Sequence, residues 1–269
     1  MTKALPKIGE LYLLPPEPDQ EGDKDHRPHM VLSRVMTSSA TVTLAYCSSQ
    51  ATEADLGAQA ILVEPSAPAF AATGLNRPTY IYPSRLVVIE PEELTQYPRI
   101  GKLEGTLLGA LRGSALPRAI GYLAGTCRDP GLAAGSLRGA VLQFSPTGRD
   151  RVGSGYAVVV TDPVFSRQHE SLNVIPVLDA DETTSQYPDL TFENRDWIAP
   201  LGGIKRALVF TRLVQAIRVK PDVSRLLPPH ADAETMREID LAMRSIFLTP
   251  DEIAAMEAPT PLEEPTSPE

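Results

Sequence analysis

The chain has 269 residues, of which 42% are hydrophobic and 22% are charged, so it is long enough for one large or two ordinary globular domains. No apolar run approaches the roughly 18 residues of a membrane span, and the first residues lack the apolar centre of a secretory signal, so we expect a cytoplasmic protein without membrane contact. The net charge of −9 argues against a nucleic-acid partner, but residues 250–269 contain six acids and no basic residue, which leaves −3 for the rest.

Short strands separated by turn residues fill the first half of the chain. Residues 40–46 show the alternation of a half-buried strand, because Val42, Leu44 and Tyr46 occupy every second position. Residues 15–25 predict an exposed loop rich in proline and acids. Leucines at helical spacing predict a helix between Leu103 and Leu111. The predicted strands of this half are residues 8–14, 29–33, 40–46, 61–63, 79–82 and 86–89.

The second half repeats this order after a linker rich in glycine, alanine and proline at residues 113–137. Asp232 is placed to cap a helix that ends before Pro250. Its apolar face consists of Met236, Ile239, Met243 and Ile246. The tail at residues 250–269 has too little apolar surface to order itself and predicts disorder. The predicted strands are residues 139–144, 157–161, 172–177, 190–192, 207–210 and 214–219.

One segment of the first half returns in the second half with its polar residues changed. Residues 25–33 read Asp-His-Arg-Pro-His-Met-Val-Leu-Ser, and residues 155–162 repeat the apolar strand with Gly155 in the place of Arg27. The spacing is regular, since Ala157 follows His29 by 128 residues and Leu178 follows Ser48 by 130. We therefore predict a duplicated unit in which the first copy has the polar residues and the second copy lacks them.

The residues Gly9-Glu10-Leu11-Tyr12, the Arg27-Pro28 pair before an apolar strand, and Cys47-Ser48-Ser49 after the next strand together resemble the MazF/PemK group of toxin-antitoxin ribonucleases. The resemblance covers residues 6–112 and, more faintly, 138–248. It implies a mainly β fold with C-terminal helices, in which two tandem SH3-like barrels, of a type shared with CcdB, form an intramolecular pseudo-dimer. The implied organisation is a barrel at 1–112, a linker at 113–137, a degenerate barrel at 138–249 and a disordered tail at 250–269.

The resemblance implies that Arg27 and Ser48 form the active centre of an endoribonuclease, a hydrolase that cleaves single-stranded RNA. RNA supplies its own nucleophile, the 2′-hydroxyl, so the protein needs to orient the strand and stabilise the anionic transition state. A guanidinium donates two parallel hydrogen bonds to phosphate oxygens, and a hydroxyl donor such as Ser48 holds one of these oxygens. This chemistry requires no metal ion or cofactor, and Cys47 and Cys127 have no metal-type spacing. An antitoxin-like protein is the second partner implied.

Four further residues are candidates for a supporting role: His26, His29, Ser49 and Tyr82. Strand alternation places one of the two histidines in the loop before the strand and the other beside the core. PemK-like proteins have an acid where this chain has Tyr82-Pro83-Ser84. This difference favours the alternative function, an inactive MazF/PemK-like binding module for a protein or nucleic acid. The single tryptophan, Trp197, is expected to pack against its barrel.

Overall fold

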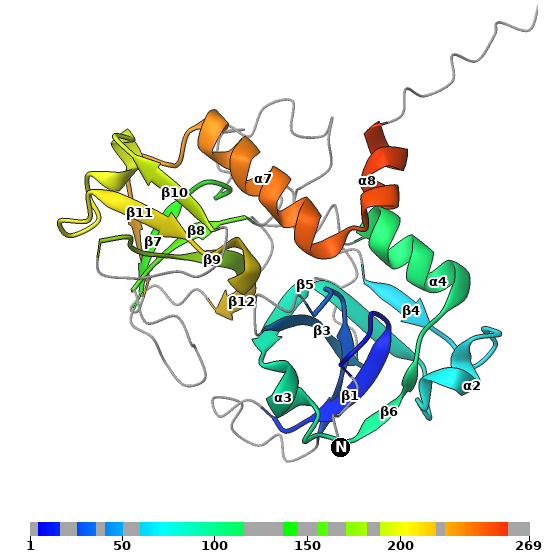
Figure 1. Ribbon diagram of the computed structural model, residues 1–269. Coiled ribbons are helices and arrows are strands. Elements are labelled where there is room, and N and C mark those ends of the chain that lie inside the picture. Colours follow the sequence, from blue (N-terminus) through cyan, green and yellow to red (C-terminus); the bar gives the residue numbers. More distant parts are fainter. Residues whose placement is uncertain are drawn as a thin grey trace, which may run out of the picture.

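The computed structural model describes residues 5–16, 26–35, 41–50, 60–115, 137–144, 155–160, 171–181, 189–218 and 224–257. Within these ranges the chain forms two antiparallel sheets accompanied by a few helices (Figure 1). The prediction of a mainly β fold with C-terminal helices is confirmed. No helix in the described ranges combines the length and the apolar character that crossing a membrane would require.

The first sheet has the strand order β4-β5-β3-β2-β1-β6, and each neighbouring pair is antiparallel. Helix α4 (Gly105–Ala110) follows the last strand and continues as the π-helical turn η1 (Leu111–Ala115). Two shorter helices are α2 (Phe70–Thr73) and α3 (Pro91–Leu94). The strands are β1 (Glu10–Leu14), β2 (Arg27–Val31), β3 (Val42–Ser48), β4 (Ile61–Val63), β5 (Thr79–Ile89) and β6 (Arg99–Lys102).

The second sheet has the order β10-β11-β9-β8-β7-β13, and β12 pairs with β9 beside this path. Helices α7 (Ala233–Phe247) and α8 (Pro250–Glu257) follow it. Two 3-10 turns, η2 (Asp196–Ile198) and η3 (Thr211–Leu213), lie between its strands. The strands are β7 (Val141–Phe144), β8 (Tyr156–Val159), β9 (Ser171–Asp179), β10 (Leu190–Glu193), β11 (Arg206–Val209), β12 (Gln215–Arg218) and β13 (Ser224–Leu227).

The two sheets have equivalent strand orders once β5 is matched to β11 and β12 together. The first part of β5 pairs with β4 and with the end of β3, while its second part pairs with the beginning of β3. Likewise, β11 pairs with β10 and the end of β9, and β12 pairs with the beginning of β9. Between these parts, residues 83–85 interrupt the ladder of β5, and η3 interrupts the chain at the corresponding place.

Backbone hydrogen bonds at the start of each sheet are also equivalent. The Gly9 N–H donates to the carbonyl of Val31 at 2.9 Å, and the Gly139 N–H donates to the carbonyl of Val159 at 2.8 Å. In return, each glycine carbonyl accepts a hydrogen bond, from Leu103 in one sheet and Ala231 in the other. Both glycines have positive φ, 86° and 78°. A backbone conformation that only glycine adopts easily thus occurs at equivalent positions before the first strand of each sheet.

Helix α7 begins and packs as the sequence predicts. The Asp232 carboxylate accepts a hydrogen bond from the Thr235 N–H at 2.7 Å, which is the geometry of a capping residue. Its predicted apolar face is buried, with Met236, Ile239, Met243 and Ile246 all in the core. Trp197 also packs in this core, as predicted, and its ring meets Phe192 edge to face with centroids 5.9 Å apart.

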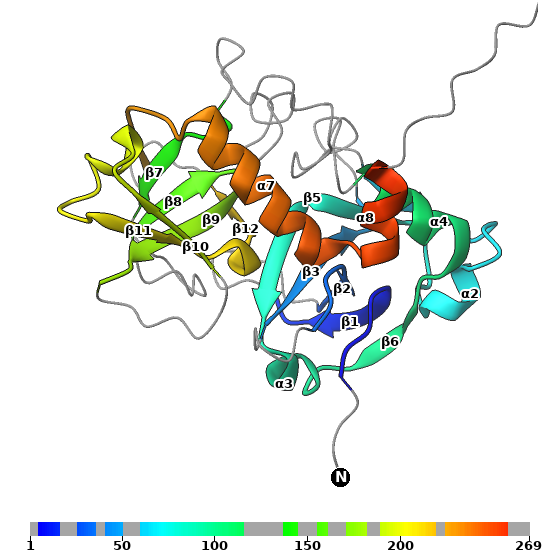
Figure 2. The same ribbon diagram turned by 45° about the horizontal axis from the view of Figure 1, so that its top comes forward.

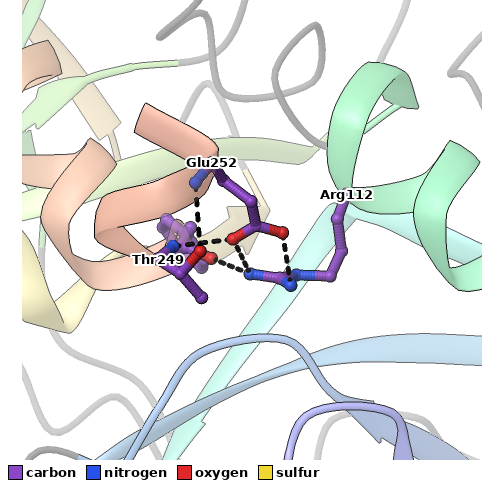
Figure 3. Close-up of polar contacts among 4 residues, drawn as sticks. Arg112, Thr249 and Glu252 are labelled. Carbon is purple, nitrogen blue, oxygen red and sulfur yellow. Dashed lines mark hydrogen bonds and ion pairs between the residues drawn. The ribbon is translucent and has the colours of Figure 1, made fainter. Parts of the chain in front are cut away.

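The two sheets share one continuous apolar core. Residues of both sheets belong to the same buried cluster, and β5 contacts β9 and β12 of the second sheet. Helix α7 lies across the junction and leads into α8, which lies beside α4 in both views (Figures 1 and 2). There Arg112 donates two hydrogen bonds to the Glu252 carboxylate, at 2.7 and 3.0 Å, and a third to the Phe247 carbonyl at 2.6 Å (Figure 3).

The structure corrects several expectations. Residues 79–82 and 86–89 belong to one strand, β5, and the predicted linker is helical as far as Ala115. The start of the tail expected to be disordered, residues 250–257, forms α8. Strands β6 and β13 and helices α2 and α3 were not predicted. The acidic loop at 17–25, the linker at 116–136 and the tail at 258–269 lie outside the described residues.

Candidate functional site

Arg27 and Ser48 lie at the same end of two adjacent strands. Arg27 is the first residue of β2 and Ser48 is the last residue of β3. The antiparallel register pairs His29 with Tyr46, so Arg27 lies two residues before one partner and Ser48 two residues after the other. Because residues two apart in a strand point to the same side, these four side chains belong to one face of the first sheet.

The same face continues onto β5. Tyr46 is paired with Tyr82, and Ser48 is paired with Tyr80. The structure therefore brings together the predicted residues Arg27, His29, Ser48 and Tyr82, and it adds Tyr46 and Tyr80, which the sequence reasoning did not single out. We call these six residues the polar face. The signal for the two added tyrosines was their spacing of two residues from Ser48 and from Tyr82.

The Ser48 hydroxyl is held by the turn that follows its strand. Its oxygen accepts a hydrogen bond from the Gln50 N–H at 3.1 Å, and a serine hydroxyl that accepts still has its own proton to donate. The Tyr82 hydroxyl donates to the Gln50 carbonyl at 3.2 Å and so braces the same turn from β5. Ser49 lies between Ser48 and Gln50 in this turn and is half-buried. Tyr82 and Gln50 thus position Ser48.

The two candidate histidines occupy different environments, as the strand alternation predicts. His26 is exposed and precedes β2, whereas the His29 side chain is buried within β2. The Nδ1 atom of His29 lies 3.0 Å from the Arg27 carbonyl oxygen, so Nδ1–H is the donor and neutral His29 has an acceptor at Nε2. Its ring meets Tyr46 edge to face at 5.5 Å. His29 therefore supports the strand that presents Arg27.

Two ionisable side chains next to the polar face are held in their neutral forms. Cys47 adjoins Ser48 in sequence but points to the opposite side, into the core, where burial raises the pKa of its thiol. Burial, together with the hydrogen bond to Glu10 and the charge of Glu10, raises the pKa of Tyr12 to about 12. Neither group supplies an anion near neutral pH. Within the described ranges no group of three or more potential metal ligands occurs.

The second sheet has apolar or small residues at the positions equivalent to the polar face. Its register pairs Ala157 with Pro176 and Leu178 with Leu208, which correspond to the pairs His29–Tyr46 and Ser48–Tyr80. Gly155 precedes β8 where Arg27 begins β2. Phe210 donates its N–H to the Pro176 carbonyl at 3.1 Å and so takes the place of Tyr82. The second sheet thus has the equivalent strand pairing without the polar side chains.

Two arginines of the second half that the structure describes, Arg206 and Arg212, lie close to carboxylates. Arg206 is exposed and pairs with Asp181 at 2.8 Å and Glu193 at 2.5 Å, and hydrogen bonds to these carboxylates raise its pKa. Arg212 is close to Asp189, at 3.3 Å. Arg149 and Arg151 lie outside the described residues.

Comparison with known proteins gives distant structural similarity. No family model matches the chain, and no curated protein matches it by sequence. Among solved structures, toxin MazF-mt6 of Mycobacterium tuberculosis is similar to 41% of this chain over 93% of its own length, with 21% identity and a TM-score of 0.29. A MazE-MazF structure from Deinococcus radiodurans is similar to 44% of this chain over 98% of its own length, with 16% identity and a TM-score of 0.33.

Proposed function

We propose that the chain is a cytoplasmic, metal-independent endoribonuclease of the toxin type, and that the polar face of the first sheet cleaves single-stranded RNA. The observation that carries the proposal is the position of Arg27 and Ser48 at one end of adjacent strands, on a face whose counterpart has Gly155 and Leu178. A guanidinium and a hydroxyl on one face suit the oxygens of a single phosphate.

In the proposed reaction the RNA 2′-hydroxyl loses its proton and attacks the adjacent phosphorus. The bond from phosphorus to the 5′ oxygen breaks, and that oxygen takes up a proton as it leaves. The products are a 2′,3′-cyclic phosphate and a 5′-hydroxyl end. Arg27 donates hydrogen bonds to the phosphate oxygens as negative charge develops, Ser48 donates one more, and His29 holds the backbone of Arg27. His26, exposed beside Arg27, is the proposed proton carrier.

The proposed organisation is a tandem duplication of units 1–112 and 138–249 that act as an intramolecular pseudo-dimer. It is supported by the equivalent strand orders, the paired glycine hydrogen bonds and the contact between β5 and β12. Joining two units in one chain raises the effective concentration of each for the other. An antitoxin-like protein is the proposed protein partner, and the polar face is the surface that it would cover.

The test is cleavage of a labelled single-stranded RNA by the wild type and by Arg27→Ala. We expect the substitution to lower the cleavage rate by about 100-fold or more, because a donor to the transition-state anion is lost. The matched control is Arg237→Ala, which removes an exposed arginine from α7 and should leave the rate unchanged. Equal rates for wild type and Arg27→Ala would rule out the proposal.

A second candidate function is an inactive binding module with the same face. It is favoured by Tyr82-Pro83-Ser84 in β5, where the family resemblance leads us to expect an acid and none of the three residues has a carboxylate. This function predicts that the wild type binds RNA or a protein without releasing a cyclic phosphate. End-group analysis of incubated RNA therefore separates the two candidates.

A further inference from the structure

Three tyrosines form a row across β3 and β5 next to Ser48. The ring centroids of Tyr46 and Tyr82 are 6.1 Å apart with planes tilted by 33°, and those of Tyr80 and Tyr82 are 6.3 Å apart with a tilt of 32°. Tyr80 is the cross-strand partner of Ser48, and Tyr46 is the partner of Tyr82. The row therefore adjoins the place where the proposed reaction holds a phosphate.

Within this row, Tyr82 has a different role from its neighbours. Its side chain is fully buried, and the guanidinium of Arg85 lies over its ring at 5.2 Å and over that of Tyr46 at 5.6 Å. Tyr46 and Tyr80 are half-buried, so each residue keeps some surface open to solvent. Tyr82 thus lies beside both half-buried rings, and Arg85 lies over the rings of Tyr82 and Tyr46.

The second sheet shows which part of the row the fold needs. Phe210, buried at the position of Tyr82, has the guanidinium of Arg212 over its ring at 5.2 Å. A buried aromatic ring under an arginine is therefore common to both sheets. The positions of Tyr46 and Tyr80 instead have Pro176 and Leu208. The two sheets therefore differ at these two positions, and the half-buried tyrosines stand on the sheet that also has Arg27 and Ser48.

We propose that Tyr46 and Tyr80 form a stacking surface for the unpaired nucleobases next to the phosphate held by Arg27 and Ser48. The inference rests on the proposed function and adds how the substrate is bound. Aromatic side chains stack on the faces of unpaired bases with little preference for sequence, and each such contact contributes to affinity. A duplex hides these faces in its own stack, so the surface selects single strands over double strands.

The experiment measures binding by fluorescence anisotropy with two labelled oligomers of deoxythymidine, which lack the 2′-hydroxyl and so resist the proposed cleavage. The second oligomer has abasic sites in place of its central bases and keeps all its phosphates. Tyr80→Leu introduces the residue of the equivalent position Leu208, so the strand should tolerate it. We expect Tyr80→Leu to weaken binding of the first oligomer about tenfold and to leave binding of the abasic oligomer unchanged.

Three further variants separate the explanations. Tyr80→Phe keeps the ring and should bind like the wild type, and Tyr156→Leu, which removes a half-buried tyrosine of the second sheet, should have no effect. Arg27→Ala should weaken binding of both oligomers, because it removes a phosphate contact. Equal losses on both oligomers for Tyr80→Leu, no loss, or no binding by the wild type would overturn the stacking surface. Base-dependent binding without RNA cleavage would instead overturn the proposed function and leave the surface standing.

Discussion

At the scale of single residues, the two sheets differ in the side chains of the polar face and of the equivalent positions in the second sheet. Arg27 and Ser48 were singled out from sequence by their motifs and the resemblance these carry; the structure brings them to one end of adjacent strands, and their role stays a prediction. Tyr46 and Tyr80 were missed despite their spacing of two residues from Ser48 and from Tyr82, since a tyrosine at an alternating strand position has the pattern of an ordinary core residue. Only the register with Ser48 and Tyr82 shows that they belong to the polar face.

Gly9 provides a test of the backbone frame. Its φ of 86° is unfavourable for any other residue, and a Cβ atom there would lie 2.4 Å from the Leu103 carbonyl oxygen. We expect Gly9→Ala to lower the free energy of unfolding by about 2 kcal/mol or more, measured by urea denaturation. The equivalent change Gly139→Ala should cost less, because its Cβ would lie 3.2 Å from the nearest atom, the Ala231 carbonyl oxygen.

Gly109 is the matched control for this substitution. It lies within α4, and a Cβ atom added there would meet nothing within 4 Å. Gly109→Ala should therefore raise the free energy of unfolding by about 0.5–1 kcal/mol, since alanine loses less backbone entropy in a helix. Destabilisation of equal size at Gly9 and Gly109 would contradict the conformational explanation.

At the scale of elements, the strongly apolar strands and α7 were predictable, while elements defined by their partners were not. Strands β6 and β13 are short, and their membership in a sheet depends on pairing with β1 and β7. Residues 79–82 and 86–89 were predicted as two strands, yet the chain continues through residues 83–85 as one strand with an interrupted ladder. The prediction of disorder for residues 250–257 rested on their acidic and proline-rich composition. It overlooked a local helix signal, the capping box Thr249-x-x-Glu252 at the start of α8.

Glu252 of this capping box also forms an ion pair with Arg112 in the first half of the chain (Figure 3). The Glu252 N–H donates to the Thr249 hydroxyl at 3.1 Å, and the Thr249 N–H donates to the Glu252 carboxylate at 2.6 Å. Burial of Glu252 favours its neutral form and is the largest single influence on its pKa, but the hydrogen bonds from Thr249 and the charge of Arg112 outweigh it. The net effect lowers the pKa of Glu252 below its ordinary value of 4.5.

A lowered pKa in the folded state means that Glu252 stabilises the protein above its ordinary pKa, and that this stabilisation is lost as the pH falls through the folded value. We expect Glu252→Gln to lower the melting temperature at pH 7 and to have a progressively smaller effect below about pH 4.5. The effect should stay within about 1 kcal/mol, because the pair is partly exposed. Asp251→Asn, at the exposed neighbouring residue, is the control; an effect of Glu252→Gln that does not change with pH would contradict the ionic explanation.

At the scale of the whole molecule, the shared buried cluster leads us to expect that the two sheets unfold as one cooperative unit. Phe247 is fully buried in this core at the end of α7, and its carbonyl accepts a hydrogen bond from Arg112 of the first unit. We expect Phe247→Ala to lower the free energy of unfolding by about 3–5 kcal/mol and to shift a single calorimetric transition. Leu241→Ala, at a position 51% exposed on the same helix, should change it by less than about 0.5 kcal/mol. Two separate transitions would show that the halves unfold independently.

The replacement of Arg27 and Ser48 by Gly155 and Leu178 in the second sheet removes the two-fold equivalence that two identical copies would have. A symmetric pair offers the same surface twice, so that a bound strand can run across it in either of two equivalent directions. When one sheet has these polar residues and the other lacks them, a bound strand has a single orientation. Under the proposed function, we therefore expect each molecule to bind one RNA strand, with its 5′ end toward the same side of β3 in every complex.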